Sequence, residues 1–151
     1  MKDNLLFNFE EFIVANRPCK VSKFDYLHAV YKSQNLHEDF IVCFCKLMWP
    51  DFKSVDGVIF VSELFNEEYY QELRASDKPI TEIQFWVNLL EITGIFDEIS
   101  TEQALLIAKI IVESWNVKLK SEYGIALARW LRDEETNEVF ITLGEINYKT
   151  E

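Results

Sequence analysis

The sequence contains few of the residues that interrupt secondary structure or bind metal ions. Its 151 residues include four glycines, three prolines, three cysteines and two histidines. The glycines are isolated, so no Gly-x-Gly-x-x-Gly, Gly-Lys-Ser/Thr or Gly-x-Ser-x-Gly motif occurs. These absences argue against phosphate binding by a glycine-rich loop and against a serine hydrolase of the nucleophile-elbow type.

Long hydrophobic runs are absent as well. The longest uninterrupted apolar stretch is Phe40 to Cys45, far shorter than the ~20 residues that span a bilayer as a helix. The first residues, Met1 to Asn4, lack the basic and apolar regions of a secretory signal. We therefore expect a cytoplasmic protein with no membrane partner.

The cysteines show no pattern typical of a zinc site or a disulfide framework. Cys43 and Cys45 are separated by one residue, and on a helix their thiols would point about 200° apart. A zinc site requires paired ligand spacing, which this chain lacks. We expect reduced thiols, no disulfide, no zinc and no other cofactor.

The composition nevertheless predicts a folded protein. Hydrophobic residues make up 49% of the chain and aromatic residues 15%, enough to build a core despite the charge. The length predicts a single domain over 1–151.

Apolar periodicity and capping signals predict a chain that is mostly helical. Asn4 to Asn16 is expected as the first helix, and Ser22 is expected to cap a second that buries Phe24, Leu27, Val30 and Tyr31. A third, about 37–49, is apolar on most sides, which favours a central, buried position. Three more helices are expected: from a cap at Ser62 to Ala75, from a capping box at Thr81 to Gly94, and from a capping box at Ser100 to about Glu122.

Strand signals are concentrated at the end of the chain. Residues 125–132 and 138–146 flank the acidic turn 133–137, and Val139, Ile141 and Leu143 alternate with other residues as in a strand. Ala126 to Ala128 would also suit a helix, and 58–61 fits either a short strand or the approach to the next helix. The predicted fold class is α+β: predominantly helical, with a small antiparallel C-terminal hairpin.

Charge is distributed unevenly along the chain. The net charge is −11, and residues 54–102 contain eleven acidic residues but only two basic ones, Arg74 and Lys78. Residues 1–53, in contrast, contain seven of each sign. A strong negative field repels nucleic acids and anionic membranes and attracts basic surfaces. We expect a basic protein partner and no nucleic-acid binding.

Two groups of residues are candidates for the partner-binding site. In the first, acidic residues and tyrosines share one expected helix, where acids four residues apart repel each other by ~0.2–0.5 kcal/mol without an evident benefit to folding. Tyrosine is also enriched at interfaces. The second group is the acidic turn of the hairpin, and the sequence leaves open which group forms the interface. The candidates are Glu63, Glu67, Glu68, Tyr69, Tyr70 and Glu72 in the first group and Asp133, Glu134 and Glu135 in the second.

The last 50 or so residues resemble small acidic proteins of bacterial toxin–immunity loci. The resemblance consists of a capped helix with Ala104, Ile107, Ala108 and Trp115, then Lys118-Leu119 and Tyr123-Gly124, an acidic turn from Asp133 and the strand 139–143. It implies a cytosolic inhibitor that binds one cognate toxin without catalysis.

The sequence therefore favours a non-enzymatic acidic binding protein that occludes a basic toxin, plausibly a nuclease, with carboxylates meeting the toxin's Lys/Arg surface. A DNA-mimic inhibitor is a variant of this interpretation. The alternatives are an adaptor or subunit that recognises another cellular protein, or an enzyme whose carboxylate site is assembled from distant residues. The oligomeric state is left open.

Overall fold

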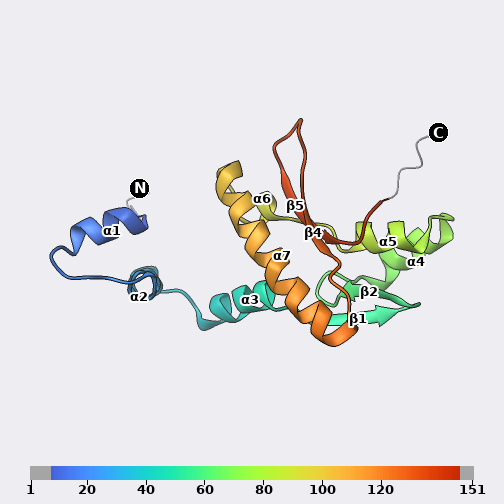
Figure 1. Cartoon of the computed structure of the whole chain (residues 1–151), viewed down its shortest axis with the longest axis horizontal. Coiled ribbons are helices and arrows are strands. Elements are labelled where there is room, and N and C mark those ends of the chain that lie inside the picture. Colours follow the sequence, from blue (N-terminus) through green and yellow to red (C-terminus); the bar gives the residue numbers. More distant parts are fainter. Residues whose placement is uncertain (1–7, 147–151) are drawn as a thin grey trace. The chain divides into compact units, whose positions relative to one another are not determined.

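A computed structural model describes residues 8–146 (Figure 1). The chain is helix-dominated α+β with two small antiparallel sheets, which confirms the predicted fold class. It divides into two compact units, residues 1–42 and 43–151, and the prediction of a single domain stays a prediction. The described elements are α1 (Phe9–Ala15), α2 (Lys23–Ser33), α3 (Glu38–Met48), β1 (Phe52–Val55), β2 (Val58–Val61), α4 (Glu67–Ala75), α5 (Ile80–Val87), β3 (Leu90–Glu91), α6 (Ile92–Ile95), α7 (Thr101–Tyr123), β4 (Ala128–Arg132) and β5 (Val139–Leu143).

The first unit contains α1, α2 and the start of α3. Ser22 caps α2 as predicted, because its hydroxyl accepts a hydrogen bond from the Asp25 N–H while the Asp25 carboxylate accepts one from Ser22. The side chains expected to be buried are not: Phe24 is 80% exposed and Leu27 61%. Within the described part of this unit no residue is fully buried, so the apolar stripe of α2 was correctly found but its burial was wrongly predicted.

Helix α3 corrects a second expectation. None of its residues is buried, and Ile41 and Val42 are exposed, whereas the sequence predicted a central helix. Its C-terminal carbonyls are nevertheless well satisfied. In unit 2 the Ser114 hydroxyl donates to the Met48 carbonyl at 2.6 Å, and the Trp115 indole N–H donates to the Leu47 carbonyl at 2.8 Å.

Helix α7 and a three-stranded sheet form the main core of unit 2. The sheet has the order β3-β5-β4, and Trp130 pairs with Ile141 in its register. Helix α7 begins at its Ser100 cap and ends at Gly124, whose φ of 75° is the left-handed conformation that glycine adopts without strain. The hairpin β4–β5 is thus confirmed, and its first arm is a strand from Ala128 onward. Buried core side chains shared by these elements are Ala104, Ala108, Ile111, Trp115, Leu119, Val139, Ile141 and Leu143.

Strand β2 is buried on both of its faces. Ile59 and Val61 belong to the main core, whereas Phe60 belongs to a second, smaller core with Tyr70 and Ile83. This placement explains the continuous apolar run of the strand, since alternate residues of a strand point to opposite faces. Strand β2 pairs with β1 through a two-residue loop, Asp56-Gly57, where no hairpin was predicted.

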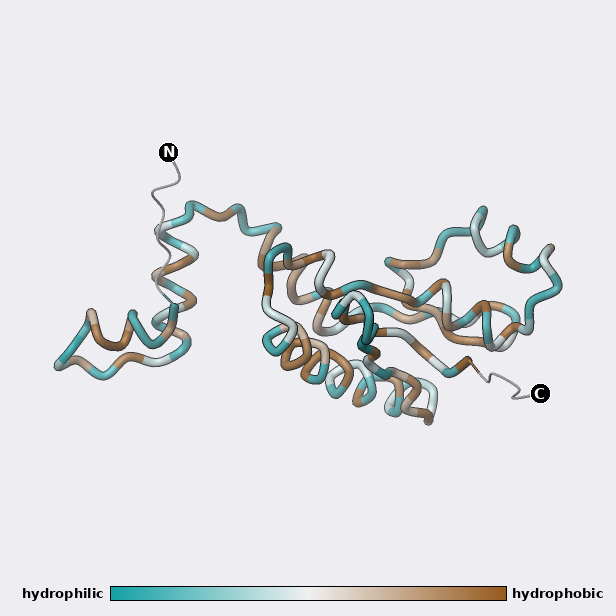
Figure 2. The backbone as a smooth tube through the Cα atoms, turned by 90° about the horizontal axis from the view of Figure 1, so that it is seen from above, coloured by the Kyte–Doolittle hydropathy of each residue, from teal (hydrophilic) through white to brown (hydrophobic). Residues whose placement is uncertain are grey.

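The predicted caps at Thr81 and Gly94 are wrong. Helix α5 starts one residue before Thr81, has Pro79 at its N-cap and no side-chain cap. It ends at Val87, because the chain then forms β3 along β5. Gly94 lies inside α6 rather than at the end of a long helix. Hydrophobic positions recur along the helices of each unit, and polar ones gather in connecting loops (Figure 2).

Candidate functional site

Helix α4 presents three of the four acidic side chains in the first predicted group. Glu67, Glu68, Tyr69 and Glu72 are all exposed, and the Tyr69 side chain is 41% accessible. Glu68 and Glu72 are one helical turn apart and lie on the side of α4 that points away from the core. The Glu67 carboxylate accepts a hydrogen bond from the Gln71 amide at 2.8 Å. The outer face of α4 is therefore acidic and carries one exposed aromatic ring.

Tyr70 is a correction to the predicted site. Its side chain is 1% exposed and packs edge-on against Phe60 at 5.5 Å between ring centroids, so it belongs to the core and not to a surface. Its hydroxyl donates to the Asp56 carboxylate. Burial, followed by the hydrogen bond to Asp56, raises the Tyr70 pKa above 10.0. Together with Leu73, this ring fixes the inner face of α4 in the smaller core.

Glu63 is exposed but does not lie on the helix. The N-cap of α4 is Asn66, whose side-chain oxygen accepts from the Tyr69 N–H at 2.8 Å, and not Ser62. Residues 62–66 form a turn and loop after β2. The expected i,i+4 pairing of Glu63 with Glu67 is therefore wrong, while Glu68 and Glu72 keep theirs.

The second predicted acidic group forms the turn between β4 and β5. Asp133, Glu134 and Glu135 are exposed. The Asp133 carboxylate accepts hydrogen bonds from the Thr136 N–H at 3.1 Å and the Glu135 N–H at 2.8 Å. These backbone bonds, that of Thr136 first, lower the Asp133 pKa below 3.8. Asp133 therefore stabilises its own turn, and Glu134 and Glu135 remain open to solvent.

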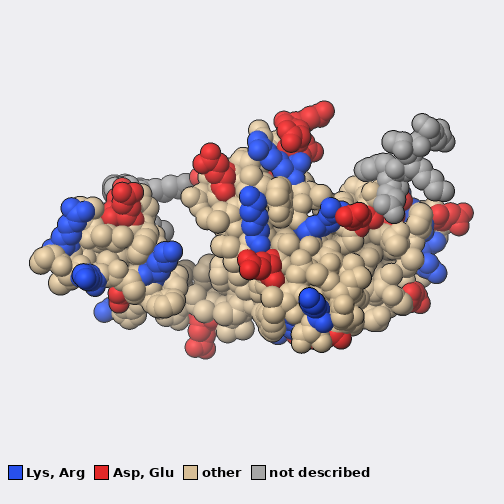
Figure 3. All heavy atoms as spheres, viewed as in Figure 1, with Lys and Arg blue, Asp and Glu red and all other residues tan. Residues whose placement is uncertain are grey.

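The structure does not bring the two acidic groups together. Figure 1 places the tip of the β4–β5 hairpin and α4 at different ends of unit 2. On the face shown in Figure 3, red acidic side chains gather at the tip of the hairpin, whereas red and blue side chains are intermixed at the end that carries α4. The two groups are therefore separate candidate surfaces.

Sequence reasoning missed Asp56, which positions the acidic helix. Asp56 and Gly57 both have positive φ, 50° and 80°, as a type I′ hairpin turn requires. Asp-Gly between two apolar stretches is a strong hairpin signal and would have revealed β1, β2 and this turn. Because Tyr70 donates to Asp56, the turn anchors the inner face of α4.

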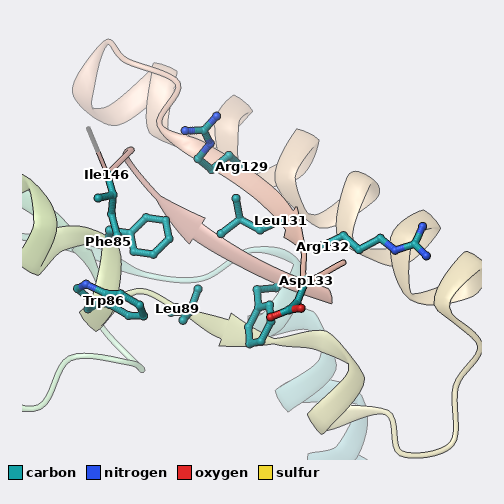
Figure 4. Close-up of a pocket in the computed structure, with 9 residues that line it drawn as sticks. Phe85, Trp86, Leu89, Arg129, Leu131, Arg132, Asp133 and Ile146 are labelled. Carbon is teal, nitrogen blue, oxygen red and sulfur yellow. The ribbon is translucent and has the colours of Figure 1, made fainter. Parts of the chain in front are cut away.

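A hollow on the sheet was also missed. It lies on the face of β4 and β5 opposite α7 and has a volume of about 460 Å³ (Figure 4). No local motif encodes it, because its walls come from α5, the loop at Leu89 and both strands of the hairpin. It is lined by Phe85, Trp86, Leu89, Arg129, Leu131, Arg132, Asp133, Phe140 and Ile146.

Among residues 8–146, no three or more His, Cys, Asp or Glu side chains gather into a group that would hold a metal ion. The three cysteines are unbonded and exposed, including Cys43 and Cys45 on α3, the helix that the sequence predicted to be buried. No helix in the same range is long and apolar enough to cross a membrane.

Comparison of the chain with protein-family models, with curated proteins and with solved structures finds no match.

Proposed function

We propose that this chain is a non-enzymatic acidic binding protein of the immunity type, which acts in the cytoplasm by occluding a basic surface on a cognate toxin. The observation that carries the proposal is the outer face of α4. Glu68 and Glu72 project into solvent beside the exposed ring of Tyr69, while Tyr70 and Leu73 hold the inner face in a core.

The anchoring of the strand behind this helix supports the proposal. Helix α4 packs against β2 through Tyr70 and Phe60. The Asn88 side chain holds the edge of β2 that does not pair with β1. Its oxygen accepts a hydrogen bond from the Val61 N–H at 2.8 Å, and its amide donates one to the Ile59 carbonyl at 3.2 Å. A binding surface held in place loses little conformational entropy when its partner docks.

The carboxylates of α4 and the Tyr69 ring would have different roles in such a complex. Exposed carboxylates chiefly accelerate association and select basic partners, because their attraction acts before contact. Affinity depends on a few desolvated anchors, of which Tyr69 is the candidate on this face. The hairpin turn is the weaker candidate, since Asp133 is engaged within the turn and residues 133–137 include no aromatic side chain.

An adaptor or subunit role is the second candidate function. It is favoured by the exposed apolar side chains of unit 1, such as Phe24 at 80% and Leu27 at 61%. An adaptor of this kind would bind through the apolar surface of α2, so charge changes on α4 would leave its binding intact.

Affinity capture from a lysate of the source organism tests the proposal. The baits are the wild-type chain, Glu68→Lys/Glu72→Lys, Phe24→Ser, and Glu113→Lys as a charge control on the exposed side of α7. We expect the wild-type chain to capture one basic protein. The Phe24→Ser and Glu113→Lys baits should capture it as well, and the α4 variant should not. A partner lost only with Phe24→Ser would favour the adaptor role and contradict the immunity proposal.

A functional arm completes this test. The captured protein is expressed in a host cell with and without this chain, and growth is recorded. We expect the partner to inhibit growth and the wild-type chain, but not the α4 variant, to restore it. A partner that does not harm the host would contradict the immunity function.

A further inference from the structure

The hollow on the open face of the sheet has walls suited to an aromatic ring. Leu131 and Phe140 are direct partners across the β4–β5 ladder, and Phe85 from α5 faces the same space. Figure 4 shows Phe85, Leu89, Leu131 and Ile146 around a common opening. A volume of about 460 Å³ lies within the ~300–1,000 Å³ typical of small-molecule sites.

The charged residues at the hollow are unusual for this molecule. In a chain of net charge −11, the three charged residues that line it are Arg129, Arg132 and Asp133. Arg129 and Arg132 lie at opposite ends of the hollow in Figure 4. The Asp133 carboxylate is occupied by the backbone of its own turn, and Arg132 donates to the Asn137 side chain at 2.6 Å. Arg129 is thus the cation best placed to meet a ligand.

A carboxylate already lies against Arg129. The Glu145 carboxylate is 2.7 Å from the Arg129 guanidinium, and the two side chains are 65% and 39% exposed. Such an exposed pair contributes little to stability, because water and salt screen it, and it is easily exchanged. A guanidinium carries five N–H donors and can bind a carboxylate through two parallel hydrogen bonds. Glu145 lines a neighbouring hollow and not this one, whereas Arg129 lines both. The ion pair therefore shows that the Arg129 guanidinium, at the border of the hollow, is accessible to a carboxylate.

We propose that this hollow binds a small aromatic carboxylate. The ring lies between Phe85, Leu131 and Phe140, and the carboxylate takes the place of Glu145 on Arg129. An apolar cavity with few oriented polar groups is the usual form of such a site. The proposal is independent of the toxin-binding function, because the hollow and the outer face of α4 consist of different residues.

Calorimetric titration of the full chain with 2-naphthoate tests the proposal, with 2-naphthylmethanol as the neutral probe of equal ring size. We expect 2-naphthoate to bind at millimolar or lower concentration and the alcohol to bind about tenfold more weakly, because the alcohol cannot form the charge-assisted hydrogen bonds with the guanidinium. Equal affinity for both probes, or no binding of 2-naphthoate, would overturn the proposal.

Three variants test whether the ligand carboxylate binds Arg129. Arg129→Gln should weaken 2-naphthoate binding about tenfold, whereas Glu145→Gln should strengthen it severalfold by removing the internal competitor. Arg74→Gln on α4, which also removes one positive charge, should leave binding unchanged. Thermal melts establish that each variant is folded. A loss with Glu145→Gln, or equal losses with Arg129→Gln and Arg74→Gln, would contradict the assigned contact.

Discussion

At the scale of single residues, buried polar side chains fix the module that carries the acidic helix. Asn88 is fully buried and makes three hydrogen bonds, from the Val61 N–H and to the carbonyls of Ile59 and Gln84. Gln84 also donates to Ile59 at 3.1 Å. These two side-chain amides hydrogen-bond the backbone N–H and C=O groups along one edge of β2, which would otherwise need another strand as a partner.

Replacing Asn88 with Ala tests this role. The Val61 N–H would lose its partner in a buried setting, whereas Ile59 would keep its bond from Gln84. An orphaned buried donor costs ~1–3 kcal/mol, and we expect the free energy of unfolding in urea to fall by that amount. A loss below about 0.5 kcal/mol, typical of surface changes, would show that Asn88 is not structural.

Tyr70 predicts a dependence of stability on alkaline pH. Burial first, and then the hydrogen bond to Asp56, raise its pKa above 10.0 in the folded state. The unfolded chain therefore releases this proton at a lower pH than the folded chain does. The stabilisation is fully present below pH 10 and is lost as the pH rises toward the folded-state pKa.

Tyr70→Phe removes the titrating group and keeps the ring. Between pH 9 and 11, a range around the ordinary tyrosine pKa of ~10, we expect the free energy of unfolding to decline less steeply for the variant than for wild type. Urea melts at several pH values measure this slope. Parallel declines for the two proteins would contradict the role of Tyr70.

At the scale of elements, the position of the α4 N-terminus changes what each glutamate does. The helix begins at Glu67, so Glu67 and Glu68 lie in its first turn, where acidic side chains interact favourably with the helix dipole. Glu72 lies one turn further on, four residues after Glu68.

The two charge reversals should therefore differ in stability. Glu68→Lys loses ~0.3–1 kcal/mol of dipole interaction but relieves repulsion from Glu72, so we expect no gain or a small loss. Glu72→Lys creates an i,i+4 pair with Glu68 and should gain ~0.2–0.5 kcal/mol. Thermal melts at low salt measure both, and a gain for Glu68→Lys larger than for Glu72→Lys would contradict the assigned helix start.

Elements set by local chemistry were predictable from the sequence. The caps at Ser22 and Ser100 and the hairpin around 133–137 depend on side chains close in sequence, and these three features were predicted. Strand β3 was missed because its two residues become a strand only by pairing with β5, about fifty positions away. The burial of α3 was mispredicted because apolar composition reports a tendency and not the presence of a partner surface.

In the candidate site, too, features set by nearby residues were predictable and features set by distant contacts were not. Exposed acids and Tyr69 were predictable from charge and helical spacing. Tyr70 was not distinguished from Tyr69, because which of two adjacent tyrosines points inward depends on where α4 begins, and the cap was assigned to Ser62 and not to Asn66. The hollow near Arg129 was beyond sequence reasoning, since three separate segments build it.

At the scale of the whole molecule, charge asymmetry is the property that the proposed function uses. Residues 54–102 contain eleven of the 26 acidic residues and two of the fifteen basic ones, and they fold into β2, α4, α5, β3 and α6 within unit 2. A concentrated negative field accelerates encounter with a basic surface, and salt reduces the effect because the Debye length is ~8 Å near 0.15 M.

The most direct test is the association rate of the captured basic partner with wild type, Glu72→Lys and the control Glu113→Lys, measured by stopped flow at low and high ionic strength. Both variants change the net charge equally, and both positions are exposed on helices. The α4 interface predicts that Glu72→Lys slows association severalfold at low salt, that salt removes most of the difference, and that Glu113→Lys has a much smaller effect. Equal rates for the two variants at low salt would contradict a binding site on α4.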